Sequence, residues 1–253
     1  MIEFTEAQLL GWITPVLWPF LRALALFSAM PVLGTRTVPM RVRIGLAGLI
    51  AFAGQASLPE MPQVPLDSPA AVALVVQQLV IGLSLGLAVR IVFAAVEFAG
   101  ELIGLQMGLN FAGFFDPVSA ASSTATARFF GTVVAWLFIV INGHLLVIAA
   151  LMQSFQAFPV GPEPFAFLRQ MTPHQWGAEI FSTGLWIALP LLAMLLFVNL
   201  VLGMISRVAS QINIFAIGFP ITIGTGLLGM LLTLPLMQRP FTMVLERLLL
   251  AFG

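Results

Sequence analysis

Long stretches of apolar residues dominate the chain, and polar residues interrupt them at only a few places. Charged residues are absent from residues 68–89, 129–162, 180–206 and 208–238. Each run is longer than the roughly 20 residues that a helix needs to cross the hydrocarbon core of a bilayer. The runs are apolar on all sides rather than at alternate positions, which argues against the strands of a membrane β-barrel. The pattern therefore predicts an all-α, polytopic membrane protein.

Proline, glycine and polar clusters divide these stretches into about six long, kinked helices within a single membrane domain, residues 1–253. The predicted helices cover residues 5–30, 40–57, 70–112, 128–158, 173–209 and 221–252. Pro15 and Pro19 lie inside the first helix, so we expect it to bend there or to start late. Between the second and third helices, Pro59, Pro62 and Pro65 recur at every third position, as along one edge of a stiff polyproline II segment.

The composition points to an apolar environment. Of the 253 residues, 60% are hydrophobic and 8% are charged, whereas about 25% of the residues in a soluble domain are charged. Most of the surface must therefore face lipid or other apolar protein. The absence of cysteine excludes a disulfide framework and thiolate chemistry. The formal net charge of zero gives no reason to expect nucleic acid as a partner.

No grouping of residues indicates catalysis. His144 and His174 are the only two histidines, and neither has a second metal ligand at helical spacing. The chain has no Walker loop and no GxSxG nucleophile elbow. We therefore expect neither an enzyme, nor a cofactor, nor a metal site. Asn-Gly-His at 142–144 lies in an apolar run, where we expect a helix contact with a satisfied imidazole.

Glycines at four-residue spacing mark the second half of the third predicted helix. Gly100, Gly104 and Gly108 share one face of a helix and form a smooth ridge. Gly82 and Gly86 have the same four-residue spacing earlier in the helix. Small residues at this spacing let another helix backbone approach closely. The ridge therefore predicts tight helix packing at this face.

The same helix carries charges inside an otherwise apolar sequence. Glu97 and Glu101 are four residues apart, and Arg90 lies two turns earlier on nearly the same face. Such carboxylates could form a proton relay in a transport path. We favour instead a buried ion-pair cluster that joins this helix to another chain, because like charges at this spacing repel unless an arginine lies between them. Arg207, near the end of the fifth helix, is a further candidate for such pairing.

The window QMGLNFAGFFDP, residues 106–117, places three aromatic rings at the end of a helix. Phe111 and Phe114 face the same way, Met107 lies one turn earlier on that face, and Phe115 follows. Aromatic residues at such a position commonly anchor a helix at the lipid interface. In a generic membrane protein that interpretation would be preferred, and the alternative is a hydrophobic constriction that seals a pore. Spacing alone does not choose between these interpretations.

At this window the sequence resembles the FliR family, a component of the flagellar type III export gate. The resemblance covers nearly the whole chain, and four segments carry it in the family's order and spacing. They are FLRALALFSAMPVLGTRTVPMRVRIGLA at 20–47, GELIGLQMGLNFAGFFDP at 100–117, NGHLLVIAALMQSFQAFPVG at 142–161 and ALPLLAMLLFVNLVLGMISRVASQINIFAIGFP at 188–220. The NGH and QMGLNFA strings resemble flagellar members more than the related subunit of virulence secretion systems.

The resemblance implies a fold and a function as expectations. Family members pack as tilted hairpins in a hetero-oligomeric helical ring with FliP and FliQ, one copy of this subunit completing the ring. FlhB and FlhA lie at the cytoplasmic side, membrane lipid surrounds the assembly, and unfolded flagellar proteins pass through the centre. The assembly belongs to the flagellar basal body in the bacterial inner membrane, displaced towards the periplasm.

The resemblance also assigns roles to residues. A loop at about 112–127 would project into the pore and plug it, and the candidate gate residues are Met107, Phe111, Phe114, Phe115 and Asp116. A small-solute secondary transporter is the alternative from another class. Transporters tend to contain inverted repeats with broken helices. The glycine-rich helix from residue 221 could pass as broken, but the first half of the chain holds no matching segment.

Overall fold

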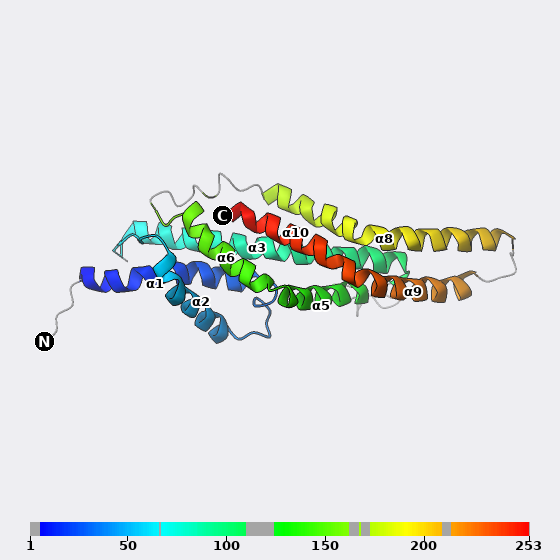
Figure 1. The fold of residues 1–253 in the computed structure, drawn as a ribbon, viewed down its shortest axis with the longest axis horizontal. Helices are drawn as coiled ribbons and strands as arrows, with labels where there is room; N and C mark the ends of the chain where they lie inside the picture. Colours follow the sequence, from blue (N-terminus) through cyan, green and yellow to red (C-terminus); the bar gives the residue numbers. More distant parts are fainter. Residues whose placement is uncertain are drawn as a thin grey trace. The chain divides into compact units, whose positions relative to one another are not determined.

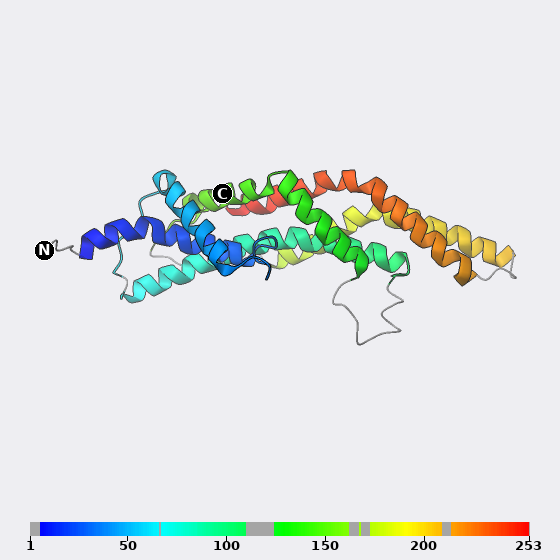
Figure 2. The ribbon, with the colours of Figure 1, turned by 90° about the horizontal axis from the view of Figure 1, so that it is seen from below.

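The computed structural model describes residues 6–65, 67–109, 124–161, 167, 173–208 and 214–252, and this part of the chain contains helices but no strand. The all-α prediction is confirmed. Figure 1 shows the elements, and Figure 2 shows them turned by 90°. In chain order they are α1 (Glu6–Ala29), α2 (Met40–Gly54), η1 (Gln55–Ser57), α3 (Pro69–Gln106), α5 (Ala125–Val140), α6 (Gly143–Ala157), α8 (Pro173–Val208), α9 (Ile214–Thr233), η3 (Leu234–Met237), α10 (Gln238–Leu249) and η4 (Leu250–Phe252).

Long apolar helices make up most of the described residues. Four of them are long and apolar enough to cross a membrane, or five if α5 and α6 count as one broken span. Every backbone polar group inside a bilayer needs a partner within the protein, and a helix supplies those partners locally. Ending a helix inside the bilayer would leave more backbone groups without partners than one proline does. The helices therefore continue through Pro15 and Pro19 in α1 and through Pro190 in α8.

Three of the predicted helices differ from the structure. The helix predicted over 70–112 ends at Gln106, and the turn after it contains Gly108, which has φ 81°. The helix predicted over 128–158 is two helices, because Asn142 has φ 57°, in the left-handed region, and α5 ends just before it. An asparagine followed by glycine favours that conformation, which ends a helix. The helix predicted from 221 begins at Ile214, with Pro220 inside it, and continues through a 3₁₀ turn, η3, into α10.

The helices form two compact units, of which the first contains Met1–Arg90, Asn142–Pro173 and Leu245–Gly253. Within it, α1 packs on α2 and on the first part of α3, and α6 contacts η4. Gly82 and Gly86 allow the close approach of α3 to α1, since a Cβ at Gly82 would lie 2.3 Å from the carbonyl oxygen of Arg22. The segment with Pro59, Pro62 and Pro65 contains no helix, and Trp18 Nε1 donates to the Pro62 carbonyl at 3.4 Å.

The second unit contains Ile91–Ile141 and His174–Val244. Its core includes the ring of Phe93, whose centroid lies 5.6 Å from that of Phe138 in α5 and 5.9 Å from that of Phe241 in α10. Glycines again allow helices to meet. A Cβ at Gly184 of α8 would lie 2.7 Å from the Ala95 carbonyl oxygen of α3. The second half of α3 is therefore a packing partner of α5, α8 and α10 in this unit.

Candidate gate site and the helices that hold it

The predicted plug segment connects α3 to α5, and most of its residues lie outside the described part of the chain. Four of the predicted gate residues, Phe111, Phe114, Phe115 and Asp116, belong to this segment. The structure does describe both ends, at Met107 and at Thr124. The geometry of these ends shows how the segment is held.

At the first end, α3 finishes in a buried anchor. Met107 is fully buried, and its side chain covers Gly226 of α9, where a Cβ would lie 2.5 Å from the sulfur. The hydroxyl of Thr222 lies 3.4 Å from the carbonyl oxygen of Met107 and 3.0 Å from that of Phe219. Gly108 then adopts φ 81°, in the left-handed region that favours glycine. The end of α3 is therefore fixed against α9 before the chain turns away.

A hollow of about 390 Å³ lies next to this anchor. Residues at the end of α3 and residues of α8 and α9 surround it. The residues that line it are Leu105, Gln106, Met107, Gly108, Asn199, Leu202, Gly203, Ser206, Gly218, Phe219 and Thr222. Its walls combine a few amide and hydroxyl groups with apolar side chains, and none of the lining residues is charged.

At the second end, Thr124 is the N-cap of α5. Its side-chain oxygen accepts a hydrogen bond from the Ala127 amide at 3.2 Å, which satisfies a donor that the first turn of a helix leaves free. Its own amide donates to the Glu101 carboxylate on α3 at 3.0 Å. Thr124 therefore ties the start of α5 to α3 as well as capping it.

We expect Thr124→Ala to lower the stability of the chain by about 1 kcal/mol, the usual cost of losing an N-cap hydroxyl. That loss corresponds to a fall in Tm of roughly 2–4 °C. Thr124→Ser should behave like the parent chain, because the serine hydroxyl can accept the same hydrogen bond. Thermal unfolding in detergent measures both variants. Equal losses for alanine and serine would contradict the cap.

Glycines on α3 allow the start of α5 to pack closely against α3. A Cβ at Gly100 would lie 2.8 Å from Cα of Ala127, and a Cβ at Gly104 would lie 2.1 Å from Oγ1 of Thr126. Gly131 of α5 faces α3 in the same way, with the Glu97 carboxylate 3.0 Å from where its Cβ would be. Two of the three predicted ridge glycines thus face α5, whereas Gly108 lies in the turn after α3.

The acidic residues of α3 line a groove beside this seam. Glu97, Glu101 and Arg128 are among the residues around a space of about 700 Å³ between α3 and α5. Glu101 is half-buried and Glu97 is exposed, and both have interactions within the chain. The structure therefore places an arginine from α5 at the groove with both carboxylates, which the sequence pattern did not indicate.

The other two residues predicted to pair charges are exposed. Arg90 lies in α3 at the edge of the first unit, and Arg207 lies in the last turn of α8. Neither is among the residues that line the groove. Burial of these arginines would require a partner chain, so pairing with another subunit stays a prediction.

Arg22 is a buried charged residue that the sequence analysis missed. It lies in α1 of the first unit and is 0% exposed. Its Nε donates to the Gln78 side chain at 2.8 Å, one terminal nitrogen donates to the Ser154 carbonyl at 2.8 Å, and the other donates to the Phe158 carbonyl at 2.9 Å. The guanidinium carbon lies 3.7 Å from the ring centroid of Phe155.

Neutral groups therefore stabilise the Arg22 charge in these contacts. Ser154 and Phe158 lie at the C-terminal end of α6, where the helix dipole attracts a cation. The Gln78 amide also donates to Gln77 at 3.0 Å, and Gln77 donates to the Pro159 carbonyl at 3.2 Å. The network holds α1, α3 and α6 together. The one signal in the sequence was the presence of an arginine and a glutamine pair within apolar helices.

The structure also corrects the expectation for His144. The imidazole was expected to have its hydrogen bonds satisfied, but its Nδ1 is buried and has no hydrogen-bond partner among the described residues. Among those residues, no group of three His, Cys, Asp or Glu could hold a metal ion.

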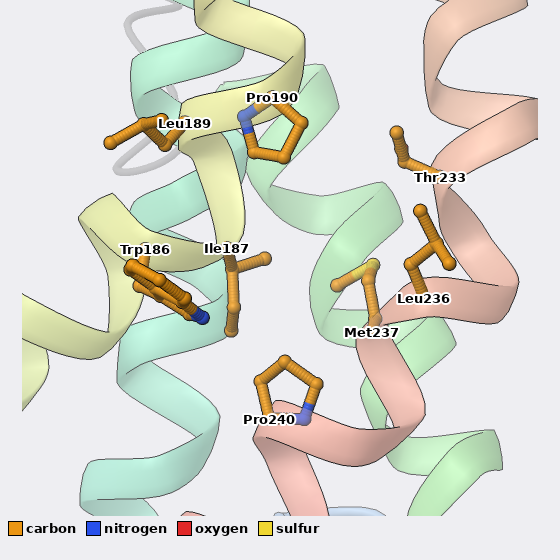
Figure 3. Close-up of a pocket in the computed structure, with 8 residues that line it drawn as sticks. All are labelled: Trp186, Ile187, Leu189, Pro190, Thr233, Leu236, Met237 and Pro240. Carbon is orange, nitrogen blue, oxygen red and sulfur yellow. The ribbon is translucent and has the colours of Figure 1, made fainter.

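An apolar hollow of about 230 Å³ lies where α8 and the α9–η3–α10 segment both change direction (Figure 3). Eight residues line it: Trp186, Ile187, Leu189, Pro190, Thr233, Leu236, Met237 and Pro240. Trp186 is 70% exposed and Leu236 is 66% exposed. Apolar side chains of this size at a surface require lipid or another helix as their neighbour.

Comparison with known proteins identifies the family. The family model described as "Bacterial export proteins, family 1" matches residues 13–248. The flagellar biosynthetic protein FliR of Escherichia coli K12 is 44% identical over 241 residues, which cover 95% of this chain and 92% of that protein. FliR of Bacillus subtilis is 31% identical over 211 residues, covering 81% and 80%. Because the family model matches most of the chain and a FliR protein is 44% identical over 95% of it, the chain belongs to the FliR family of bacterial export proteins.

Proposed function

We propose that this chain is a subunit of the flagellar type III export gate, where it forms with FliP and FliQ the closed channel through which unfolded flagellar proteins leave the cell. The full-length similarity to flagellar biosynthetic proteins carries this proposal. The proposed location is the inner membrane at the flagellar basal body, with the assembly displaced towards the periplasm and FlhB and FlhA at its cytoplasmic side.

The exposed apolar surface supports an assembled state. Large apolar side chains are exposed along α8 and α9, including Phe197, Leu200, Leu228 and Leu231. A bilayer alone could solvate them. In a ring, the same faces would instead meet helices of FliP and FliQ, and the hollows beside them would accept side chains of those neighbours.

The residues that flank the 110–123 segment support the plug proposal. A segment that closes a pore must stay in register with the pore while its tip moves. The Met107 anchor on α9 and the Thr124 tie to Glu101 supply two fixed points on one compact unit. We propose that Phe111 and Phe114 close the channel from this frame, with Phe115 and Asp116 supporting them.

Assembly tests the function directly. The chain, expressed with FliP and FliQ, should co-purify with both in one complex much larger than its own 27.2 kDa. Cells that lack the chain should build no flagella, although their soluble flagellar proteins accumulate. Recovery of the chain as a stable monomer that binds a small solute would overturn the proposal in favour of a transporter.

We expect Phe111→Ala together with Phe114→Ala to make the closed channel leak, because two large rings no longer fill the constriction. The measurement is passive entry of ions or a small impermeant dye into cells in which export is inactive. Phe52→Ala with Phe129→Ala is the matched control, since both rings are exposed elsewhere on the chain. A tight membrane in the first double variant would argue strongly against the plug.

A further inference from the structure

We propose that α2 and the turn before it form a binding site for an anionic phospholipid. The headgroup would bind Arg36 and Arg41, and an acyl chain would lie along the exposed apolar face of α2. The proposal does not rest on the export role, since it needs only a chain embedded in a membrane. It assigns a ligand to a surface that neither the gate nor the buried arginine uses.

The charge of this region has one sign. Four arginines but no aspartate or glutamate occur between Glu6 and Glu60. One of the four, Arg22, is buried in its own network. The remaining three lie in eight residues at the start of α2, so this end of the helix is strongly electropositive. The positive end of the α2 helix dipole adds to the potential.

Arg43 forms hydrogen bonds within the chain, whereas Arg36 and Arg41 are exposed. Its guanidinium folds back and donates to the carbonyl oxygens of Thr35 and Val38, which holds the turn between α1 and α2 closed. Arg36 in the turn and Arg41 at the start of α2 thus present two guanidinium groups beside this closed turn. Guanidinium binds phosphate oxygens well through two parallel hydrogen bonds.

An exposed apolar face continues from the arginines along α2. Arg41, Gly45, Leu49 and Phe52 recur at helical spacing, so they share one face. Leu49 is 67% exposed and Phe52 is 66% exposed. No atom lies within 4 Å of where a Cβ at Gly45 would be, so the surface is open and smooth there. The opposite side of α2, at Ala47 and Ala51, is buried.

The length of this face fits one lipid leaflet. The 12 residues from 42 to 53 rise about 18 Å at 1.5 Å per residue, and half of a hydrocarbon core of ~30 Å is about 15 Å. A phospholipid has the same order of groups as this face, with phosphate at one end and an apolar chain beyond it. An acidic protein segment would match the arginines but not the apolar residues. The combined pattern therefore favours the lipid.

Lipid retention by the full chain in mild detergent tests the site. Native mass spectrometry would count the lipids that remain bound after addition of phosphatidylglycerol or phosphatidylcholine with identical acyl chains. We expect at least fivefold more phosphatidylglycerol than phosphatidylcholine on the parent chain. Excess inorganic phosphate should displace little of it, since phosphate has no acyl chain to contact α2.

Variants separate the two halves of the site. Arg36→Gln with Arg41→Gln should remove the preference for phosphatidylglycerol. Leu49→Gln should lower retention of both lipids while the preference persists. Arg207→Gln with Arg239→Gln removes the same charge from exposed arginines elsewhere and should change nothing. Thermal unfolding confirms that each variant is folded.

Three outcomes would overturn the proposal. They are equal retention of the two lipids by the parent chain, an unchanged preference after loss of Arg36 and Arg41, and an equal loss in the Arg207 and Arg239 control. The first or second outcome, together with an acidic peptide that binds the parent chain and not the Arg36 and Arg41 variant, would assign the arginines to a protein partner.

Discussion

Replacement of Arg22 by alanine is expected to destabilise the chain more than any other single change considered, by about 3–5 kcal/mol. The substitution opens a cavity where a large, fully buried side chain was, and it removes the donors that Gln78 and the Phe158 carbonyl use. In a chain of this length, such a loss corresponds to a fall in Tm of roughly 10 °C.

Two further variants show which property of Arg22 matters. Arg22→Met fills most of the space but leaves the hydrogen-bond acceptors unpaired. We therefore expect it to lower the free energy of unfolding by about 1–3 kcal/mol. Arg22→Lys keeps the charge, but one ammonium group cannot replace the planar guanidinium across three helices and on the Phe155 ring. Lysine should therefore fail to restore stability.

The measurement is thermal unfolding of the purified chain in detergent. Arg239→Ala is the control, because it removes an exposed arginine and should shift Tm by little. A lysine variant as stable as the parent chain would show that charge alone is needed. A methionine variant as stable as the parent would show that the hydrogen bonds contribute nothing net, as can happen for buried charges.

The Arg22 network also shows where prediction from the sequence ends. The apolar runs predicted most helices, because a helix in lipid depends on the composition of its own segment. The partners of Arg22 lie 56, 132 and 136 residues away in the sequence. No local pattern indicates that α1 and α6 meet, so a charge in an apolar helix could not be assigned to its acceptors.

The same distinction applies to the break at Asn142 and to the charges on α3. The Asn-Gly pair is a local signal for the end of a helix, and it was interpreted instead as a contact within a longer one. Glu97 and Glu101 were correctly placed on one face by their spacing. Their neighbour at the groove, Arg128, comes from α5, and only the packing of α5 on α3 brings it there.

For the seam itself, the glycine spacing predicted a close approach, but the partner helix and the depth of contact come from the structure. Gly100→Ala is expected to lower the free energy of unfolding by about 1–3 kcal/mol, because the new methyl group would meet the α5 backbone at Ala127. α5 would have to move, and with it the tie from Thr124 to Glu101. Export should therefore fall together with Tm.

Gly104→Ala offers a sharper test of the same seam. Its methyl group would meet the Thr126 hydroxyl, which is a side chain and can be removed. We expect Gly104→Ala to destabilise the chain and Thr126→Ala to relieve much of that loss in the double variant, which gives a favourable coupling in a double-mutant cycle. Thr126→Ala should give no such relief to Gly100→Ala, because backbone blocks that site.

Gly224→Ala is the matched control for both variants. Gly224 is a helical glycine of α9 with no atom within 4 Å of where its Cβ would be. Alanine should therefore stabilise the chain there by about 0.5–1 kcal/mol, through its higher helix propensity. The expected changes in Tm are thus opposite in sign for the same substitution on two helices. A gain at Gly100 equal to that at Gly224 would mean that α5 does not pack against α3 at this distance, and the frame inferred for the gate would be lost with it.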